Sequence, residues 1–104
     1  MQIQFNRNKN VPESDGLITS STSLISEALS RFTQQITRLE VHFSDEDGSK
    51  DGLNDKRCMV EARLAGMQPI AVTNQANTHE QAMVGALDKL KSALEKTTGR
   101  LKDY

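Results

Sequence analysis

The hydrophobic period of this chain changes several times along its length. The opening "MQIQF" alternates polar and apolar residues, which predicts a short strand. Residues 6–21 contain a polar cluster together with Pro12 and Gly16, so we expect a loop there. From about Ser21 apolar residues recur every three or four positions, which predicts an amphipathic helix. Its apolar stripe consists of Leu24, Ile25, Ala28, Leu29, Phe32 and Ile36.

The middle of the chain returns to alternation with a period of two. The segments "TRLEVHFS" (residues 37–44) and "KRCMVEARL" (residues 56–64) each place their apolar residues on one side, which predicts two half-buried strands. These residues are Leu39, Val41 and Phe43 in the first segment and Cys58, Val60, Ala62 and Leu64 in the second. The segment "QPIAVTNQA" (residues 68–76) predicts a fourth strand, and Pro69 near its start fits either the first residue of a strand or an edge position.

A second helix is predicted after the fourth strand. Thr78 and Gln81 have the spacing of a capping box, in which two side chains satisfy free N–H groups of the first turn. We expect Gly99 to end this helix or to weaken it. The apolar stripe behind the cap consists of Met83, Ala86, Leu87, Leu90, Ala93 and Leu94.

The order of elements is therefore β-α-β-β-β-α, and the predicted fold class is α+β. We expect one domain over residues 1–104, with a four-stranded sheet and two helices packed on one face in two layers. A helix joins the first two strands, so they can pair in parallel through a right-handed crossover. The last three strands are expected to form an antiparallel meander.

Composition narrows the class of protein. Hydrophobic residues make up 36% of the 104 residues, which is typical of a globular domain rather than a disordered chain. No apolar run approaches the ~18 residues of a membrane span, and the first residues lack the apolar core of a secretory signal. The single Cys58 allows no internal disulfide. We therefore expect a cytoplasmic protein without a membrane partner.

The stretch "DGSKDGLNDKRC", residues 47–58, resembles a calcium loop in its spacing of Asp, Ser and Gly. An EF-hand loop lies between two helices, however, and this one lies between two predicted strands. Cys58 also stands where a bidentate Glu is required, and a thiolate is a poor ligand for a hard cation. The sequence favours a long hairpin loop, in which Gly48 and Gly52 supply turn conformations.

Candidate catalytic residues are few. A nucleophilic Cys58 would need a base, and the candidates are His42 and His79. His42 lies on the polar side of its strand while Cys58 lies on the apolar side of the next, so the two should not meet. No phosphate-binding glycine loop and no zinc-ligand spacing occurs. We expect no enzymatic activity, no cofactor, no metal and no small-molecule substrate.

Charge is distributed unevenly although the net charge is only −1. Residues 1–55 hold five Lys and Arg against nine Asp and Glu, and residues 56–104 hold eight against five. On a helical wheel centred on Leu90, one flank of the last helix carries Lys89, Lys96 and Arg100. The other flank carries Lys91 and Lys102, mixed with Glu80 and Glu95.

The first of these flanks contains no acid and spans about 16 Å at 1.5 Å per residue, provided that the helix continues past Gly99. Such a row could contact the phosphates of a nucleic acid. The alternative is an ordinary solvated helix flank, with i,i+4 pairs such as Lys91 with Glu95, and composition alone favours it. The charge pattern alone leaves both interpretations open.

Four segments together resemble the ribosome hibernation-promoting factor family in its short form, which includes the ribosome-associated inhibitor and the sigma-54 modulation proteins. They are "MQIQF", "SEALSRFTQQITRLEVHFSD", "KRCMVEARLAGMQPIAV" and "THEQAMVGALDKLKSALEKTTGRLK". The resemblance covers nearly the whole chain. It implies a layout similar to that of a double-stranded-RNA-binding domain and a stress-related role in translation.

What the resemblance implies about function is specific. Members bind the small ribosomal subunit through 16S ribosomal RNA, occupy the space of mRNA and tRNA in the decoding region, and silence idle ribosomes. A monomer or a weak dimer is expected. Carried over by position, the RNA-binding residues are Arg31, Lys56, Arg57, Lys89, Lys91, Lys96, Arg100 and Lys102.

Two departures from the family accompany this resemblance. The loop over residues 45–55 is long and acidic, and the segment after the first helix is short, so we expect that helix to end earlier than in relatives. Two other functions stay open at this stage. One is a protein-interaction or regulatory module that uses the acidic loop 45–55, and the other is a binder of free duplex RNA.

Overall fold

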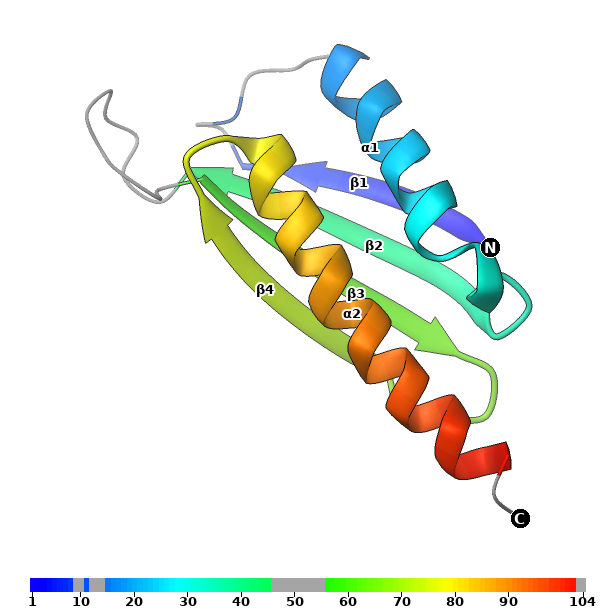
Figure 1. The fold of residues 1–104 in the computed structure, drawn as a ribbon. Helices are drawn as coiled ribbons and strands as arrows, with labels where there is room; N and C mark the ends of the chain where they lie inside the picture. The colour runs from blue at the N-terminus through cyan, green and yellow to red at the C-terminus, as the bar shows by residue number, and fades with distance from the viewer. Residues whose placement is uncertain (9–10, 12–14, 46–55, 103–104) are drawn as a thin grey trace.

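The computed structural model describes residues 1–8, 11, 15–45 and 56–102, with side chains through Thr97. A four-stranded sheet carries both α-helices on one face (Figure 1). This arrangement confirms the predicted α+β class, the order of elements and the two layers. The elements are β1 (Gln2–Arg7), α1 (Asp15–Ala28), a 3-10 turn η1 (Ser30–Phe32), β2 (Ile36–Asp45), β3 (Lys56–Leu64), β4 (Ile70–Ala76) and α2 (His79–Lys102).

The strands lie in the order β1-β2-β3-β4, so neighbours in sequence are neighbours in the sheet. Strand β1 pairs with β2 in parallel, from Gln2 opposite Arg38 to Arg7 opposite Phe43. Parallel neighbours require a crossover connection, which α1 supplies. The pairs β2–β3 and β3–β4 are antiparallel, as the meander prediction requires.

The core lies between the sheet and the helices. The alternating apolar residues of β2 and β3 face each other in register, with Leu39 opposite Ala62, Val41 opposite Val60 and Phe43 opposite Cys58. All six are buried, which confirms the predicted inner face. The predicted stripe of the last helix is also buried except for Ala93, which is only partly covered, and Ala82 joins it.

The predicted loop over residues 6–21 is wrong at its C-terminal end, because α1 already begins at Asp15. The run "TSSTS" hides the helix, since Ser and Thr are weak helix formers. In the structure their hydroxyls donate to backbone carbonyls of the preceding turn, Ser20 to Leu17 and Thr22 to Ile18. Ser21 is fully buried, so the inner stripe continues through a residue that reads as polar.

The predicted continuation of the first helix to Ile36 is also wrong. Helix α1 ends at Ala28, and the chain tightens into η1, where the Phe32 N–H donates to the Leu29 carbonyl. Leu29, Phe32 and Ile36 are buried as the apolar spacing requires. A 3-10 turn and the first residue of β2 bury them in place of two further helical turns.

Helix α2 begins as predicted and ends later. The Gln81 N–H donates to the Thr78 hydroxyl at 3.1 Å, which is one half of the expected capping box. The helix passes Gly99 and continues to Lys102, so Gly99 does not end it.

A second glycine of α2 has a steric role. A Cβ at Gly85 would lie 2.0 Å from the Asn74 side-chain nitrogen, and this nitrogen donates to the Ala82 carbonyl. Gly85 therefore lets α2 approach β4 closely.

Candidate nucleic-acid interface

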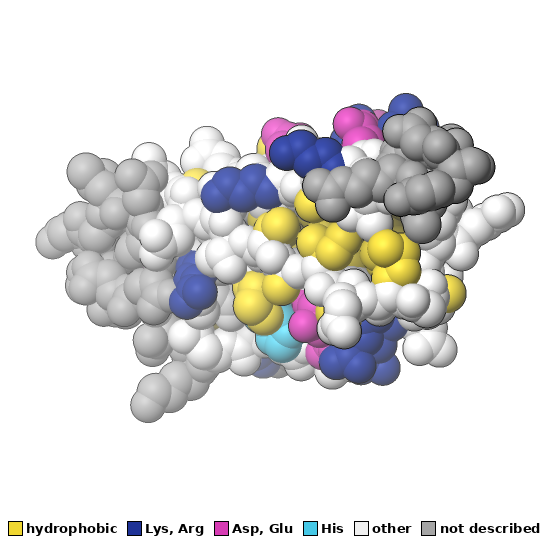
Figure 2. Space-filling view, turned by 90° about the horizontal axis from the view of Figure 1, so that it is seen from below, with side chains coloured by type: hydrophobic (Ala, Val, Ile, Leu, Met, Phe, Trp, Pro, Cys, Tyr) yellow, Lys and Arg dark blue, Asp and Glu magenta, His cyan; other side chains and the backbone are white. Residues whose placement is uncertain are grey.

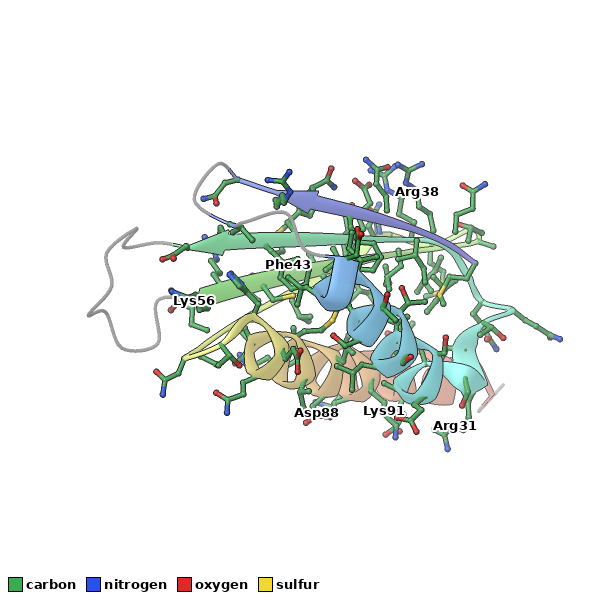
Figure 3. All side chains as sticks on the ribbon, turned by 90° about the horizontal axis from the view of Figure 1, so that it is seen from above. Arg31, Arg38, Phe43, Lys56, Asp88 and Lys91 are labelled. Carbon is green, nitrogen blue, oxygen red and sulfur yellow. The ribbon has the colours of Figure 1, made fainter. Side chains whose placement is uncertain are left out.

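The outward surface of α2 carries the cations that the helical wheel singled out. Lys89, Lys91 and Lys96 are all exposed. Figure 3 shows Asp88 and Lys91 on the side of the helix layer that points away from the sheet. The carboxylate of Asp88 therefore lies among the lysines on the outward surface of α2.

The flank of α2 that carries Lys89 and Lys96 faces the edge strand β4. The Lys89 ammonium donates to the Thr73 carbonyl of β4 at 2.8 Å. An ammonium has three donors, so this contact leaves two for other partners. Lys96 lies two helical turns further along the same flank, and Arg100 follows in the last turn of α2.

The opposite flank of α2 faces α1 and η1. Arg31 in η1 forms an ion pair with Glu95 at 3.1 Å and also lies over the ring of Phe32. Both charged side chains are well exposed, at 68% and 47%. Such exposed pairs contribute about 0.2–1 kcal/mol, so a phosphate could replace Glu95 as the partner of Arg31 at little loss. The sequence offers Lys91 with Glu95 as an example of an ordinary flank pair, and in the structure Glu95 forms an ion pair with Arg31.

The two hairpin candidates lie elsewhere. Lys56 pairs with Asp45 at 2.9 Å at the last register position of β2 and β3, and both side chains are mostly covered. Arg57 follows the opposite parity to Cys58 and therefore lies on the outer face of the sheet, away from the helices. Lys56 and Arg31 lie at opposite ends of the molecule in Figure 3.

The eight predicted residues therefore do not form one cluster. Figure 2, which views the molecule from below, shows Lys and Arg side chains in separate groups on both sides of a central hydrophobic strip. Lys89 and Lys96 share one flank of α2, and Arg31 approaches the other flank. Arg100 and Lys102 belong to the last helical turn, while Lys56 and Arg57 belong to the hairpin.

A polar cluster on the outer face of the sheet was not predicted. Glu40 of β2 is only 16% exposed, and its carboxylate lies 3.6 Å from Arg38, 3.4 Å from Arg63 and 3.9 Å from His42. Arg63 also contacts Glu61 at 3.4 Å. The alternation of β2 and β3 indicated these residues as polar-face positions. Their clustering depends on the register, which sets Arg38 opposite Arg63.

The described residues offer little for catalysis. Burial raises the pKa of the Cys58 thiol to about 12, so it stays protonated near neutral pH and is a poor nucleophile. His79 packs edge-on against Phe43, and His42 lies on the outer face of the sheet. Among the described residues no group of three His, Cys, Asp or Glu could hold a metal. The calcium-like spacing at residues 47–55 lies outside them.

Comparison with known proteins identifies the relatives of this chain. No curated protein sequence matches it. The N-terminal domain of Thermus thermophilus Protein Y superposes with a TM-score of 0.73 and 16% identity over 93% of this chain and 99% of that one. A ribosomal subunit interface protein from Coxiella burnetii gives a TM-score of 0.70 and 19% identity over 95% and 99% of the two chains. These likenesses confirm the fold.

Over the described part of the chain, neither α1 nor α2 has both the length and the apolar character of a membrane span.

Membership of a family rests on the sequence. The family profile described as "Sigma 54 modulation protein / S30EA ribosomal protein" matches residues 7–102, which is most of the chain. The chain therefore belongs to the Sigma 54 modulation protein / S30EA ribosomal protein family.

Proposed function

We propose that this cytoplasmic protein is a non-enzymatic ribosome hibernation factor that binds the small ribosomal subunit. It occupies the mRNA and tRNA decoding region and blocks translation by steric exclusion. The family includes proteins described as ribosomal, and one structural relative is described as a ribosomal subunit interface protein. The observation that carries the proposal is the exposed lysine flank of α2, formed by Lys89 and Lys96 and continued in sequence by Arg100.

In this proposal the α2 flank provides the main contacts to 16S ribosomal RNA. Lys89 and Lys96 are seven residues apart, so their α-carbons lie about 10 Å apart along one side of the helix. Lys91 and Lys102 add contacts from the other flank of α2, and Arg31 joins when a phosphate displaces it from Glu95. Lys56 is committed to Asp45 and Arg57 faces the other way, so both contribute less.

The test is co-sedimentation with purified 30S and 70S particles between about 50 and 200 mM salt. The wild-type protein should pellet at low salt and be released steeply as salt rises. Lys89→Gln with Lys96→Gln should weaken binding about tenfold or more and reduce the log–log salt slope by about 2, because two phosphate contacts are lost.

The matched control is Gln68→Glu with Gln75→Glu, which changes the net charge by the same two units at exposed sites away from α2. It should bind like the wild type or nearly so. Absence of pelleting at any salt, with circular dichroism showing a folded protein, would contradict ribosome binding. Equal binding to free duplex RNA would instead favour a general duplex-RNA binder.

A further inference from the structure

Strand β1 is an edge strand of the described sheet, and one of its two backbone sides faces away from β2. In the described sheet β1 pairs only with β2. The Asn8 N–H donates to the Phe43 carbonyl, and backbone groups of alternate residues point to opposite sides of a strand. The N–H and C=O groups of Ile3 and Phe5 therefore point away from β2, where no other described strand meets them.

The two edges of the sheet are protected differently. At the β4 edge Lys89 covers the Thr73 carbonyl, and Pro69 stands just before the strand. Lysine and proline are common devices that keep an edge strand from pairing with another chain. The sequence of β1, "QIQFNR", contains neither residue. Within the described residues, the β1 edge therefore shows neither of the two devices found at the β4 edge.

The β1 sequence is complementary to itself in one antiparallel register. When Gln4 of two copies lies on a twofold axis, Gln2 stands opposite Asn6 and Ile3 stands opposite Phe5. Amide side chains then pair on the outer face and apolar side chains on the inner face. Because Ile3 and Phe5 direct their backbone groups outward, each such pair exchanges two hydrogen bonds, giving four across the axis.

In the same register, the exposed Met1 of one copy lies near an apolar cavity of the other copy. Met1 is 40% exposed, and it would stand opposite Arg7 of the second copy. Beside Arg7 lies a mostly apolar cavity of about 70 Å³, lined also by Phe5, Leu17 and Ile18. Ile18 itself is 42% exposed at the rim. Residues diagonal to each other across an antiparallel pair are within reach, so Met1 of one copy would cover this cavity in the other.

We propose that the β1 edge is a pairing surface for β1 of a second copy of this chain, joined antiparallel about Gln4 into a continuous eight-stranded sheet. This inference goes beyond the proposed function and does not depend on it. A single six-residue strand pair is a small interface, so the dimer is weak and depends on concentration. It leaves the outward surface of α2 uncovered, since α2 packs over β3 and β4 (Figure 1).

Charge at position 4 tests the twofold register. Gln4→Lys and Gln4→Glu each place like charges directly opposite across the axis, which opposes pairing. By sedimentation equilibrium each variant should be monomeric at concentrations where the wild type dimerises. Their equimolar mixture should form a heterodimer. Gln75→Lys, at an exposed outer-face position of β4, is the matched control and should dimerise like the wild type.

A cross-linking experiment gives a second readout. Gln4→Cys would bring two thiols together at a non-hydrogen-bonded pair, where the α-carbons are about 4.5 Å apart and a disulfide can form. Cys58 is buried and does not compete. Under mild oxidation Gln4→Cys should cross-link at least ~10-fold faster than Gln75→Cys, because pairing raises the effective thiol concentration.

Two results would overturn the proposal. One is dimerisation of Gln4→Lys and of Gln4→Glu alone with the affinity of the wild type, since the contact would then lie elsewhere. The other is a wild-type protein that stays monomeric at the highest attainable concentration, together with Gln4→Cys cross-linking no faster than Gln75→Cys. Circular dichroism of every variant shows whether the fold is retained.

Discussion

The outer face of the sheet and the outward surface of α2 both carry Lys or Arg side chains, yet these cations have different neighbours. On the sheet, Arg38 and Arg63 lie against the half-buried carboxylate of Glu40. Around α2, Lys91 and Lys96 are exposed, and Arg31 forms its ion pair with Glu95, which is itself exposed. A phosphate approaching the sheet must displace a carboxylate that is held from several sides. The ability of a surface to bind phosphate therefore depends less on how many cations it carries than on how strongly each cation is held by its present carboxylate partner.

The two surfaces are separate only if the core between the sheet and the helices is closed to solvent. Cys58 lies in this core, and its titration gives the largest expected effect on stability. Its pKa is about 12 in the folded protein against 9.0 as the ordinary value. The unfolded chain therefore loses this proton first as pH rises above 9. The free energy of unfolding should fall by up to about 1.4 kcal/mol per pH unit between pH 9 and 12.

The measurement is urea unfolding at pH 8 to 10.5 for the wild type and for Cys58→Ala. The variant is less stable at pH 8 because it leaves a cavity, but it should lack this part of the pH slope. Rapid alkylation of Cys58 in the folded protein, or identical slopes for the two proteins, would show that the layer is open.

The second test compares two carboxylates, one on each surface. Glu40→Gln should lower the free energy of unfolding by about 1–2 kcal/mol, because Arg38 and Arg63 lose a half-buried partner. Glu95→Gln should change it by less than about 0.5 kcal/mol, because both members of its pair are exposed. Chemical denaturation of the two variants checks this, and equal losses would remove the distinction between the surfaces.

The third test concerns the close packing of α2 on β4 at Gly85 and Asn74. In an Asn74→Ala background, Gly85→Ala should stabilise the protein by about 0.8 kcal/mol through helix propensity. In the wild-type background the new Cβ must displace the Asn74 amide and its bond to Ala82, so the gain should disappear. A double-mutant cycle should give a coupling of about 1–2 kcal/mol. Additive effects would contradict the close contact.

The smallest expected effect is on RNA affinity. Glu95→Gln should raise ribosome binding roughly 2–5-fold at low salt, because it removes an acid from the α2 surface and releases Arg31. Glu61→Gln removes the same charge from the outer face of the sheet, next to Arg63, and should change binding less. Titration of 30S particles with both variants measures the difference. A larger gain for Glu61→Gln would assign the RNA contact to the sheet.

The spacing of hydrophobic residues in the helices and their alternation in the strands predicted most of the architecture. The alternation around Val41 and Val60 identified the inner face, and the stripe around Leu90 identified the buried side of α2. The failures have local causes. Ser21 is a buried position occupied by a polar residue, and the hydroxyls near it bond back into the helix, so the start of α1 was not visible.

The candidate interface was harder to predict than the fold. A helical wheel separates the two flanks of α2 but contains no information about the other elements that pack against them. It could not show that Lys89 reaches the Thr73 carbonyl or that Glu95 takes Arg31 as its partner. Both contacts join residues brought together only by packing. The cluster around Glu40 likewise depends on strand register, which alternation alone does not determine.

The parallel pairing of β1 with β2 has a consequence for the newly made chain. Gln2 pairs with Arg38, 36 positions later, so β1 is synthesised well before its partner exists. At 5–20 residues per second the interval is roughly 2–7 s. The meander β2–β3–β4 joins strands that follow one another directly in the sequence, so its contacts are of shorter range and can form without β1. We therefore expect β1 to dock late during synthesis, and until then it is the segment most open to capture by a chaperone.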